Sequence, residues 1–132
     1  MKTYHGSCHC GAVRFEADID LAAGTLRCNC SYCQKIRCWV AAVPIDAFRL
    51  TAGESALTDY QFGARREHHY FCRHCGVRVF GRAQSARRGP FYGISISCLD
   101  DATAAELAAA AVTWIDGKND RWYTPPAQVQ HL

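Results

Sequence analysis

Two short stretches decide the fold: Gly6-Ser7-Cys8-His9-Cys10-Gly11 near one end and Phe71-Cys72-Arg73-His74-Cys75-Gly76 near the middle. The first stretch has two cysteines two residues apart. We expect a strand to begin there, so that both side chains point to one face. The second has two cysteines three residues apart before a glycine, the spacing of a zinc knuckle. Together they predict one structural Zn²⁺ site, with the four ligands Cys8, Cys10, Cys72 and Cys75.

A third motif, Cys28-Asn29-Cys30-Ser31-Tyr32-Cys33, brings three cysteines together within six residues. Three thiolates leave one position of a tetrahedral zinc open, which is typical of catalytic zinc. We therefore predict a second zinc of the catalytic type on Cys28, Cys30 and Cys33. The alternative is a closed site whose fourth ligand comes from Cys38, Cys98 or a histidine.

The other candidate residues carry weaker signals. Cys38 and Cys98 fit buried small side chains, although Cys38 lies only five residues after the third motif. His68 and His69 are neighbours on an expected strand and face opposite sides, so one of them can approach the second zinc. The favoured alternative for both is a structural or solvated role. The arginines form either a solvated face or a rim that binds carboxylates. They are Arg65, Arg66, Arg73, Arg78, Arg82, Arg87 and Arg88.

The composition fits a single zinc-binding domain over residues 1–132. Nine cysteines indicate either disulfides or metal binding. The first residues contain no apolar signal-like stretch, so we expect a cytoplasmic protein whose cysteines bind metal. The formal charge of +3 counts the cysteines as neutral thiols. Seven thiolates on two zinc ions would cancel that charge, so we expect no nucleic-acid partner. The longest Ala-rich stretch, Leu107 to Val112, is too short to span a membrane, so we expect no membrane partner either.

Short strands dominate the expected secondary structure. Apolar residues alternate with polar ones at Val13, Phe15, Ala17 and Ile19, which predicts a half-buried strand over 12–19. Further strands are expected at 25–29, 39–43, 47–51, 56–62, 66–71, 77–82 and 91–98. Residues 31–36 form a turn or a helical turn, and the capping box Thr103-x-x-Glu106 predicts one short helix. The sequence thus predicts a mainly β protein, whose exposed sheet edges permit a homodimer.

The three cysteine motifs, in this order, resemble those of the glutathione-dependent formaldehyde-activating enzyme (GFA) family, also called the centromere protein V/GFA (CENP-V/GFA) domain. The resemblance covers residues 6–82, and Leu99-Asp100-Asp101 is similar to a later part of the family. It implies a tent-like, Mss4-like fold of short antiparallel strands. It also implies a structural zinc on the first four cysteines and a catalytic-type zinc on Cys28, Cys30 and Cys33. The family's named activity joins formaldehyde to glutathione and is classed with the carbon–sulfur lyases.

Two places differ from the family pattern: Asn29 stands where many relatives have His, and Ile36-Arg37-Cys38-Trp39 is bulkier than usual. Our leading hypothesis is a carbon–sulfur lyase acting on an adduct of an aldehyde with glutathione or a similar thiol, such as S-hydroxymethylglutathione. The second zinc would bind the thiolate. The alternative is a non-enzymatic binding module in which both zincs are structural, and Cys38 as a fourth ligand would favour it.

Overall fold

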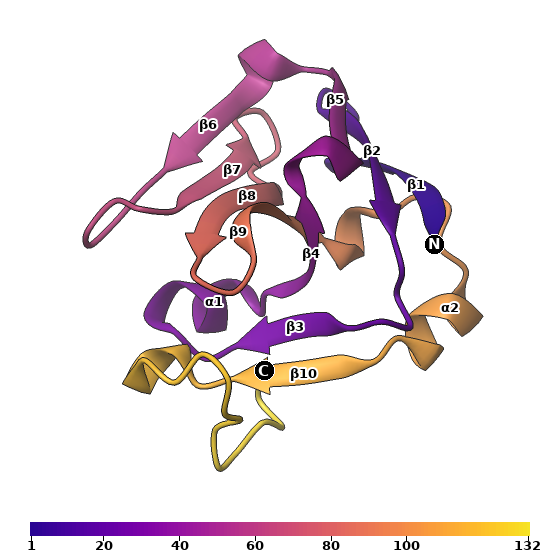
Figure 1. The fold of residues 1–132 in the computed structure, drawn as a ribbon. Helices are drawn as coiled ribbons and strands as arrows, with labels where there is room; N and C mark the ends of the chain where they lie inside the picture. Colours follow the sequence, from indigo (N-terminus) through magenta and orange to yellow (C-terminus); the bar gives the residue numbers. More distant parts are fainter.

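The computed structural model describes residues 1–132 and is mainly β, which confirms the predicted fold class (Figure 1). The strands are β1 (Lys2–Ser7), β2 (Arg14–Ile19), β3 (Thr25–Cys28), β4 (Trp39–Pro44), β5 (Phe48–Ala52), β6 (Leu57–Tyr60), β7 (His68–Cys72), β8 (Arg78–Ser85), β9 (Gly89–Ser95) and β10 (Val112–Ile115). The helices are α1 (Ser31–Ile36) and α2 (Ala104–Ala109). No helix is both long and apolar enough to cross a membrane.

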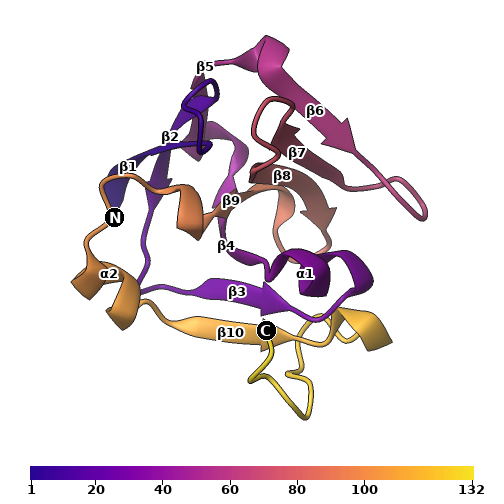
Figure 2. The ribbon, with the colours of Figure 1, turned by 180° about the vertical axis from the view of Figure 1, so that it is seen from behind.

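The strands form two sheets, which suits a tent-like, Mss4-like fold. One has three antiparallel strands in the order β1-β2-β5, and the other has seven in the order β10-β3-β4-β9-β8-β7-β6. All neighbours in the larger sheet are antiparallel except β10 and β3, which run parallel. Figure 1, and Figure 2 from behind, show β3 and β10 running side by side below the other strands, while β6 and β7 lie at the opposite end of the sheet.

Aromatic side chains join the two sheets in the core. Phe15 of β2 packs against Phe48, with ring centroids 5.7 Å apart. Phe48 in turn contacts Phe80 and Tyr92 of the larger sheet, at 4.5 and 4.6 Å. The inward side chains of β2 are buried in the alternating order that the sequence predicts. Burial of this apolar surface is the main force that holds the sheets together.

The prediction that Cys8-x-Cys10 begins a strand is wrong. Both cysteines lie in the turn between β1 and β2, and β1 itself was not predicted. The Gly11 N–H donates to the Cys8 carbonyl at 3.1 Å, and Gly11 has φ +78°, a conformation that glycine adopts readily. The two sulfurs therefore meet because the chain turns, and not because strand side chains alternate.

The structure has two short helices. Residues 31–36, predicted as a turn or a helical turn, form the helix α1, and the Cys30 sulfur caps it by accepting from the Cys33 N–H at 3.3 Å. Arg37 follows with φ +47°, which ends the helix and turns the chain into β4. The predicted capping box of α2 is present.

Candidate metal centres

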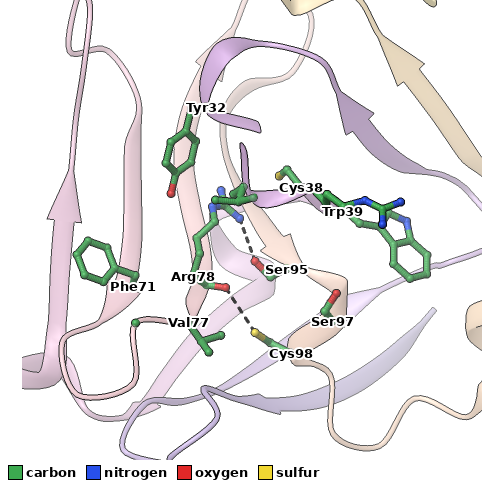
Figure 3. A pocket seen from close by; sticks show the side chains of 12 residues that line it. Tyr32, Cys38, Trp39, Phe71, Val77, Arg78, Ser95, Ser97 and Cys98 are labelled. Atoms are coloured by element: carbon green, nitrogen blue, oxygen red, sulfur yellow. Dashed lines mark hydrogen bonds between the residues drawn. The ribbon is translucent and has the colours of Figure 1, made fainter. Parts of the chain in front are cut away.

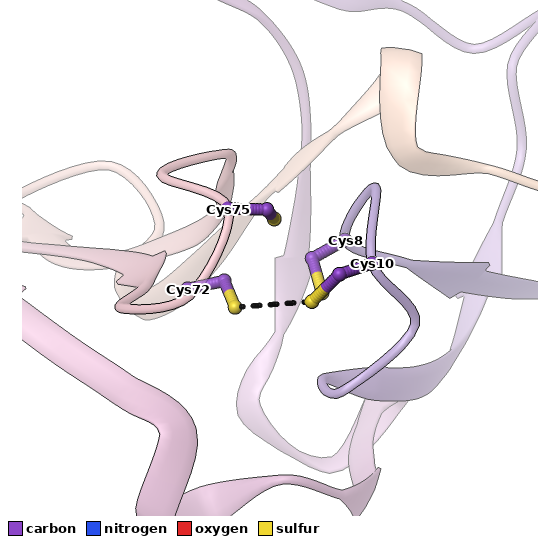
Figure 4. Close-up of side chains that lie close together, drawn as sticks. All are labelled: Cys8, Cys10, Cys72 and Cys75. Carbon is purple, nitrogen blue, oxygen red and sulfur yellow. Dashed lines mark hydrogen bonds between the residues drawn. The ribbon is translucent and has the colours of Figure 1, made fainter.

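The first cysteine centre joins the β1–β2 turn to the β7–β8 turn (Figure 4). The Cys10 sulfur is 3.6 Å from that of Cys8 and 3.7 Å from that of Cys72. When the sulfur of Cys75 is included, all four sulfurs lie within 4.8 Å of one another. Zinc with Zn–S bonds of about 2.3 Å needs sulfurs about 3.8 Å apart. The four predicted ligands are therefore brought together with spacing that suits one zinc ion.

Backbone N–H groups point at three of the four sulfurs in this centre. The Val13 N–H donates to the Cys8 sulfur at 3.3 Å, and the His74 N–H donates to the Cys72 sulfur at 3.4 Å. The N–H groups of Val77 and Cys10 lower the pKa of Cys75 to about 6. Such bonds are the usual second layer around metal-bound sulfur. The chemistry of this centre fits a structural metal between the two sheets.

The second centre lies where β3 meets α1. Cys28 is the last residue of β3, Cys30 caps α1, and Cys33 lies in its first turn. Their sulfurs lie within 4.8 Å of one another, and no fourth Cys, His, Asp or Glu atom joins that group. The Cys30 N–H donates to the Cys28 sulfur at 3.3 Å. The structure thus gathers the three predicted cysteines into one centre.

The protonation of the three thiols shows how crowded the centre is. The Cys28 and Cys33 thiols donate to the Cys30 sulfur and lower the pKa of Cys30 to about 2. The reciprocal interaction with Cys30 raises the pKa of Cys28 to about 11, and the pKa of Cys33 rises as well because of Cys28 and Cys30. Without a cation, one thiolate is favoured over three. A bound divalent cation would allow all three sulfurs to ionise, which fits the donor set of a zinc site.

The candidates for a fourth ligand lie outside the group of three sulfurs. Cys38 is buried behind Cys33, and this contact is the largest cause that lowers the pKa of Cys38 to about 7. The Cys98 thiol instead donates to the Arg78 carbonyl oxygen at 3.5 Å, and its sulfur belongs to neither group. Only Cys38 is therefore a neighbour of the centre among the two remaining cysteines.

The two adjacent histidines face opposite sides of β7, in agreement with the prediction. His68 Nδ1 lies 2.6 Å from Asp59 Oδ2 at the surface. His69 is buried against Tyr32, with ring centroids 4.1 Å apart, and neither of its nitrogens has a hydrogen-bond partner. His69 therefore packs beside the helix that carries Cys33 without being a member of the sulfur group.

A segment after β10 covers one side of the second centre, which the sequence analysis did not predict. Because Ile115 pairs with Cys28, Gly117 lies directly against the cysteine motif. A Cβ atom on Gly117 would be 2.6 Å from the Cys28 sulfur. Asn29 Nδ2 donates to Asp116 Oδ1 at 2.8 Å and fastens this segment. Asp116-Gly117 is recognisable as a turn, but only the parallel pairing shows where that turn lies.

A cavity of about 470 Å³ is lined by residues next to both motifs in the sequence (Figure 3). Tyr32 and Cys38, on either side of Cys33 in the sequence, line one wall. Gly76 and Val77 follow Cys75 and line another part. The cavity is mostly apolar, with Arg37, Arg78, Ser95 and Ser97 as polar residues. Seven arginines were named from the sequence as a possible rim that binds carboxylates. Of these seven, only Arg78 lines the cavity.

Comparisons with known proteins agree with these observations. A family model described as glutathione-dependent formaldehyde-activating enzyme matches residues 3–117. A Penicillium rubens protein, named provisionally as such an enzyme, is 35% identical over 92 residues, which cover 66% of this chain and 47% of that protein. This chain thus spans about half the length of that relative.

A crystal structure of a Rhodobacter sphaeroides protein is similar with a TM-score of 0.70 and 33% identity. The match covers 83% of this chain and 99% of the other. All three cysteine motifs lie inside the residues that the family model matches. The chain therefore belongs to the glutathione-dependent formaldehyde-activating enzyme family.

Proposed function

We propose that the protein is a zinc-dependent carbon–sulfur lyase acting on an adduct of an aldehyde with a glutathione-like thiol, such as S-hydroxymethylglutathione. Family membership supports the reaction class. The observation that carries the proposal is the group of three sulfurs with no fourth protein ligand, beside a cavity. We assign a structural zinc to Cys8, Cys10, Cys72 and Cys75, and a second, catalytic-type zinc to Cys28, Cys30 and Cys33.

The residues around the second centre hold its ligands and limit access to it. The N–H groups of Cys30 and Cys33 fix the sulfurs of Cys28 and Cys30. The backbone of Gly117 covers one side, so a thiol approaches from another. A zinc ion bound there would supply a soft Lewis acid that stabilises an incoming thiolate at neutral pH.

The reaction itself makes modest demands on the protein. In the cleavage direction the adduct's hydroxyl loses its proton, its C–O bond becomes C=O, and the C–S bond breaks. The sulfur keeps the electron pair and ends as a thiol once a proton is added. Holding the thiol in place and favouring its thiolate form can accelerate both directions.

The experiment is exchange NMR on a mixture of glutathione and formaldehyde with the zinc-loaded protein, because the uncatalysed addition also proceeds in water. We expect the wild-type protein to accelerate exchange between free glutathione and its adduct. Cys33→Ser should lose at least about tenfold of that acceleration, since removal of a metal ligand destroys the centre. The control Ser55→Ala, exposed and outside both sulfur groups and the cavity, should retain it. Exchange no faster than in buffer would reject the proposal.

A second candidate is a zinc-dependent binding module with both zincs structural. The observation in its favour is the position of Cys38, buried next to Cys33, where a small rearrangement would add a fourth sulfur. Zinc analysis of Cys38→Ser separates the two candidates. Loss of one zinc together with absent catalysis would favour the module, and full zinc content would favour the lyase.

A further inference from the structure

A second cavity, of about 440 Å³, is lined by side chains of both sheets and by none of the cysteines. Tyr70 of β7 lines it, whereas the neighbouring His69 packs against Tyr32 of α1, on the other face of that strand. The volume of this cavity lies in the ordinary range for small-molecule sites. The molecule therefore has a second cavity that is separate from both cysteine centres.

Four aromatic rings form much of the wall of the second cavity: Phe48, Tyr70, Phe80 and Tyr92. Phe80 is buried, and the other three rings are only half-buried. The Phe80 centroid lies 4.9 Å from that of Tyr70, and Phe80 meets Tyr92 edge to face at 5.7 Å. Tilted rings around an open cavity leave aromatic surface in contact with water, which a ligand would cover at a gain in free energy.

Two carboxylates, those of Glu54 and Asp59, also line the second cavity, and no Lys, Arg or His side chain does. None of the ion pairs in the structure includes Glu54. Asp59 binds His68 Nδ1 through Oδ2 at 2.6 Å, which leaves Oδ1 without that partner. The chain thus brings two negative charges to an aromatic wall and places no positive charge between them.

Positive side chains stay at the margin of the second cavity. His68 of β7 pairs with Arg82 of β8, on the same face of the sheet as Tyr70, but neither lines the cavity. Burial and then the charge of Asp59 raise the pKa of Tyr70, so its phenol stays neutral at physiological pH. The lining therefore offers carboxylates and neutral rings to a ligand.

Backbone contacts fix the position of Glu54. This residue begins the short helical turn that connects β5 to β6 (Figure 1). Gly53 precedes it with φ +87°, and a Cβ atom on Gly53 would collide with the Ala12 carbonyl oxygen. After the turn begins, the Arg73 N–H donates to the Ala56 carbonyl oxygen at 2.8 Å. The turn is held at both ends before any ligand binds, which lowers the entropy cost of binding.

We propose that the second cavity binds a small methylated ammonium ion, with its methyl groups against the rings and its charge facing Glu54 and Asp59. Aromatic faces attract such an ion without hydrogen bonds from nitrogen. Both carboxylates are exposed at the rim, where water competes with them for the N–H groups of a primary ammonium. An anion would be repelled there, and a neutral ligand would leave both charges unused. This site is independent of the proposed lyase activity.

NMR titration of the zinc-loaded protein tests this site, with the Tyr70 and Tyr92 ring resonances as the readout. The probes are choline, its neutral carbon analogue in which a quaternary carbon replaces the nitrogen, and ethanolamine, which lacks the methyl groups. We expect wild type to bind choline at least about tenfold more tightly than the carbon analogue, and more tightly than ethanolamine.

Two variants locate the binding. Glu54→Gln keeps the size of an exposed side chain and should weaken choline binding at least about threefold, with the carbon analogue unaffected. The matched control Asp46→Asn, which removes an exposed carboxylate outside the cavity, should bind choline as wild type does. Tyr92→Leu removes one ring and should abolish most of the preference for choline over the carbon analogue.

Several outcomes would overturn the site. Equal wild-type affinity for choline and its carbon analogue does so even if Tyr92→Leu fails to fold, and so does the absence of any shift of the ring resonances with choline. A choline preference that is unchanged in both Glu54→Gln and a folded Tyr92→Leu places the binding elsewhere. Ethanolamine binding as tightly as choline contradicts the preference for a methylated ion.

Discussion

At the scale of single residues, Gly117 controls the space beside the three-cysteine centre. Gly117→Ala would place a Cβ atom 2.6 Å from the Cys28 sulfur and 3.2 Å from Cys30 Cβ. We expect zinc affinity at this centre to fall roughly 10- to 100-fold, as for other changes next to metal ligands. Competition with a coloured chelator measures this.

The control for that substitution is Gly93→Ala, whose added Cβ would have Val40 as its nearest neighbour, at an ordinary 3.9 Å. It should keep both zinc affinities. Wild-type affinity in Gly117→Ala would show that the segment after β10 does not press on the centre.

His69 makes a pH-dependent contribution that belongs to the same scale. Burial and the charge of Arg78 lower the pKa of His69 from 6.5 to about 4. The folded state thus favours neutral His69. Its contribution to stability is complete above pH 6.5 and is lost as the pH falls from 6.5 toward about 4, where the unfolded chain binds the proton more readily.

Histidine ring NMR of the zinc-loaded protein checks this prediction directly. The His69 resonances should stay constant from neutral pH down to about pH 5.5. Those of His5, whose pKa is raised by its hydrogen bond with Asp101, should shift above pH 6.5. A His69 midpoint near 6.5 would mean that the side chain is not buried as the structure shows.

The grouping of the cysteines was predictable at this scale, and their surroundings were not. The short spacing within one motif limits where its sulfurs can point, so the motifs of Cys28 and Cys72 could be interpreted locally. The surroundings of Gly117 and Arg78 depend on contacts between segments far apart in the chain. Arg78 stood in the sequence as one of seven similar arginines, and only the fold separates it from the exposed ones.

At the scale of elements, α2 tests a capping box that the sequence predicted. Thr103 Oγ1 accepts from the Glu106 N–H at 3.1 Å, and Glu106 Oε2 accepts from the Thr103 N–H at 2.7 Å. Thr103→Ala should lower the free energy of unfolding of the zinc-loaded protein by about 1 kcal/mol. Urea denaturation measures it. Thr124→Ala, exposed and outside any helix, should change stability by less than about 0.5 kcal/mol, and equal losses in both variants would argue against the cap.

Strands with clear alternation were predicted well, and short strands at the ends were missed. β2 alternates over six residues with its apolar side chains facing the core. β10 has only four residues and pairs with β3, more than eighty positions earlier in the chain. Nothing local identifies such a partner. The error at Cys8 has a similar cause, because spacing of two residues fits both a strand and a tight turn.

At the scale of the whole molecule, the first cysteine centre joins the two sheets. Structural zinc contributes on the order of 10 kcal/mol in small domains, about as much as the entire stability of a typical protein. We therefore expect Cys10→Ser, or removal of all metal by a chelator, to unfold the chain. Circular dichroism reports this. Cys33→Ser should remain folded, because the second centre links only β3 and α1, which are neighbours in the chain, and does not join the two sheets. A folded spectrum in Cys10→Ser at wild-type stability would contradict the role of this centre.

The central claim is that the second centre holds zinc through three cysteines and accepts a substrate thiol as the fourth ligand. X-ray absorption at the zinc edge, combined with zinc analysis, measures the mean number of sulfur ligands per zinc. The account predicts two zincs per chain, with a mean near about 3.5 sulfurs that rises to about 4 when glutathione is added, in both wild type and Cys38→Ser. A mean of about 4 without glutathione, falling in Cys38→Ser, would instead show a closed four-cysteine site and contradict the claim.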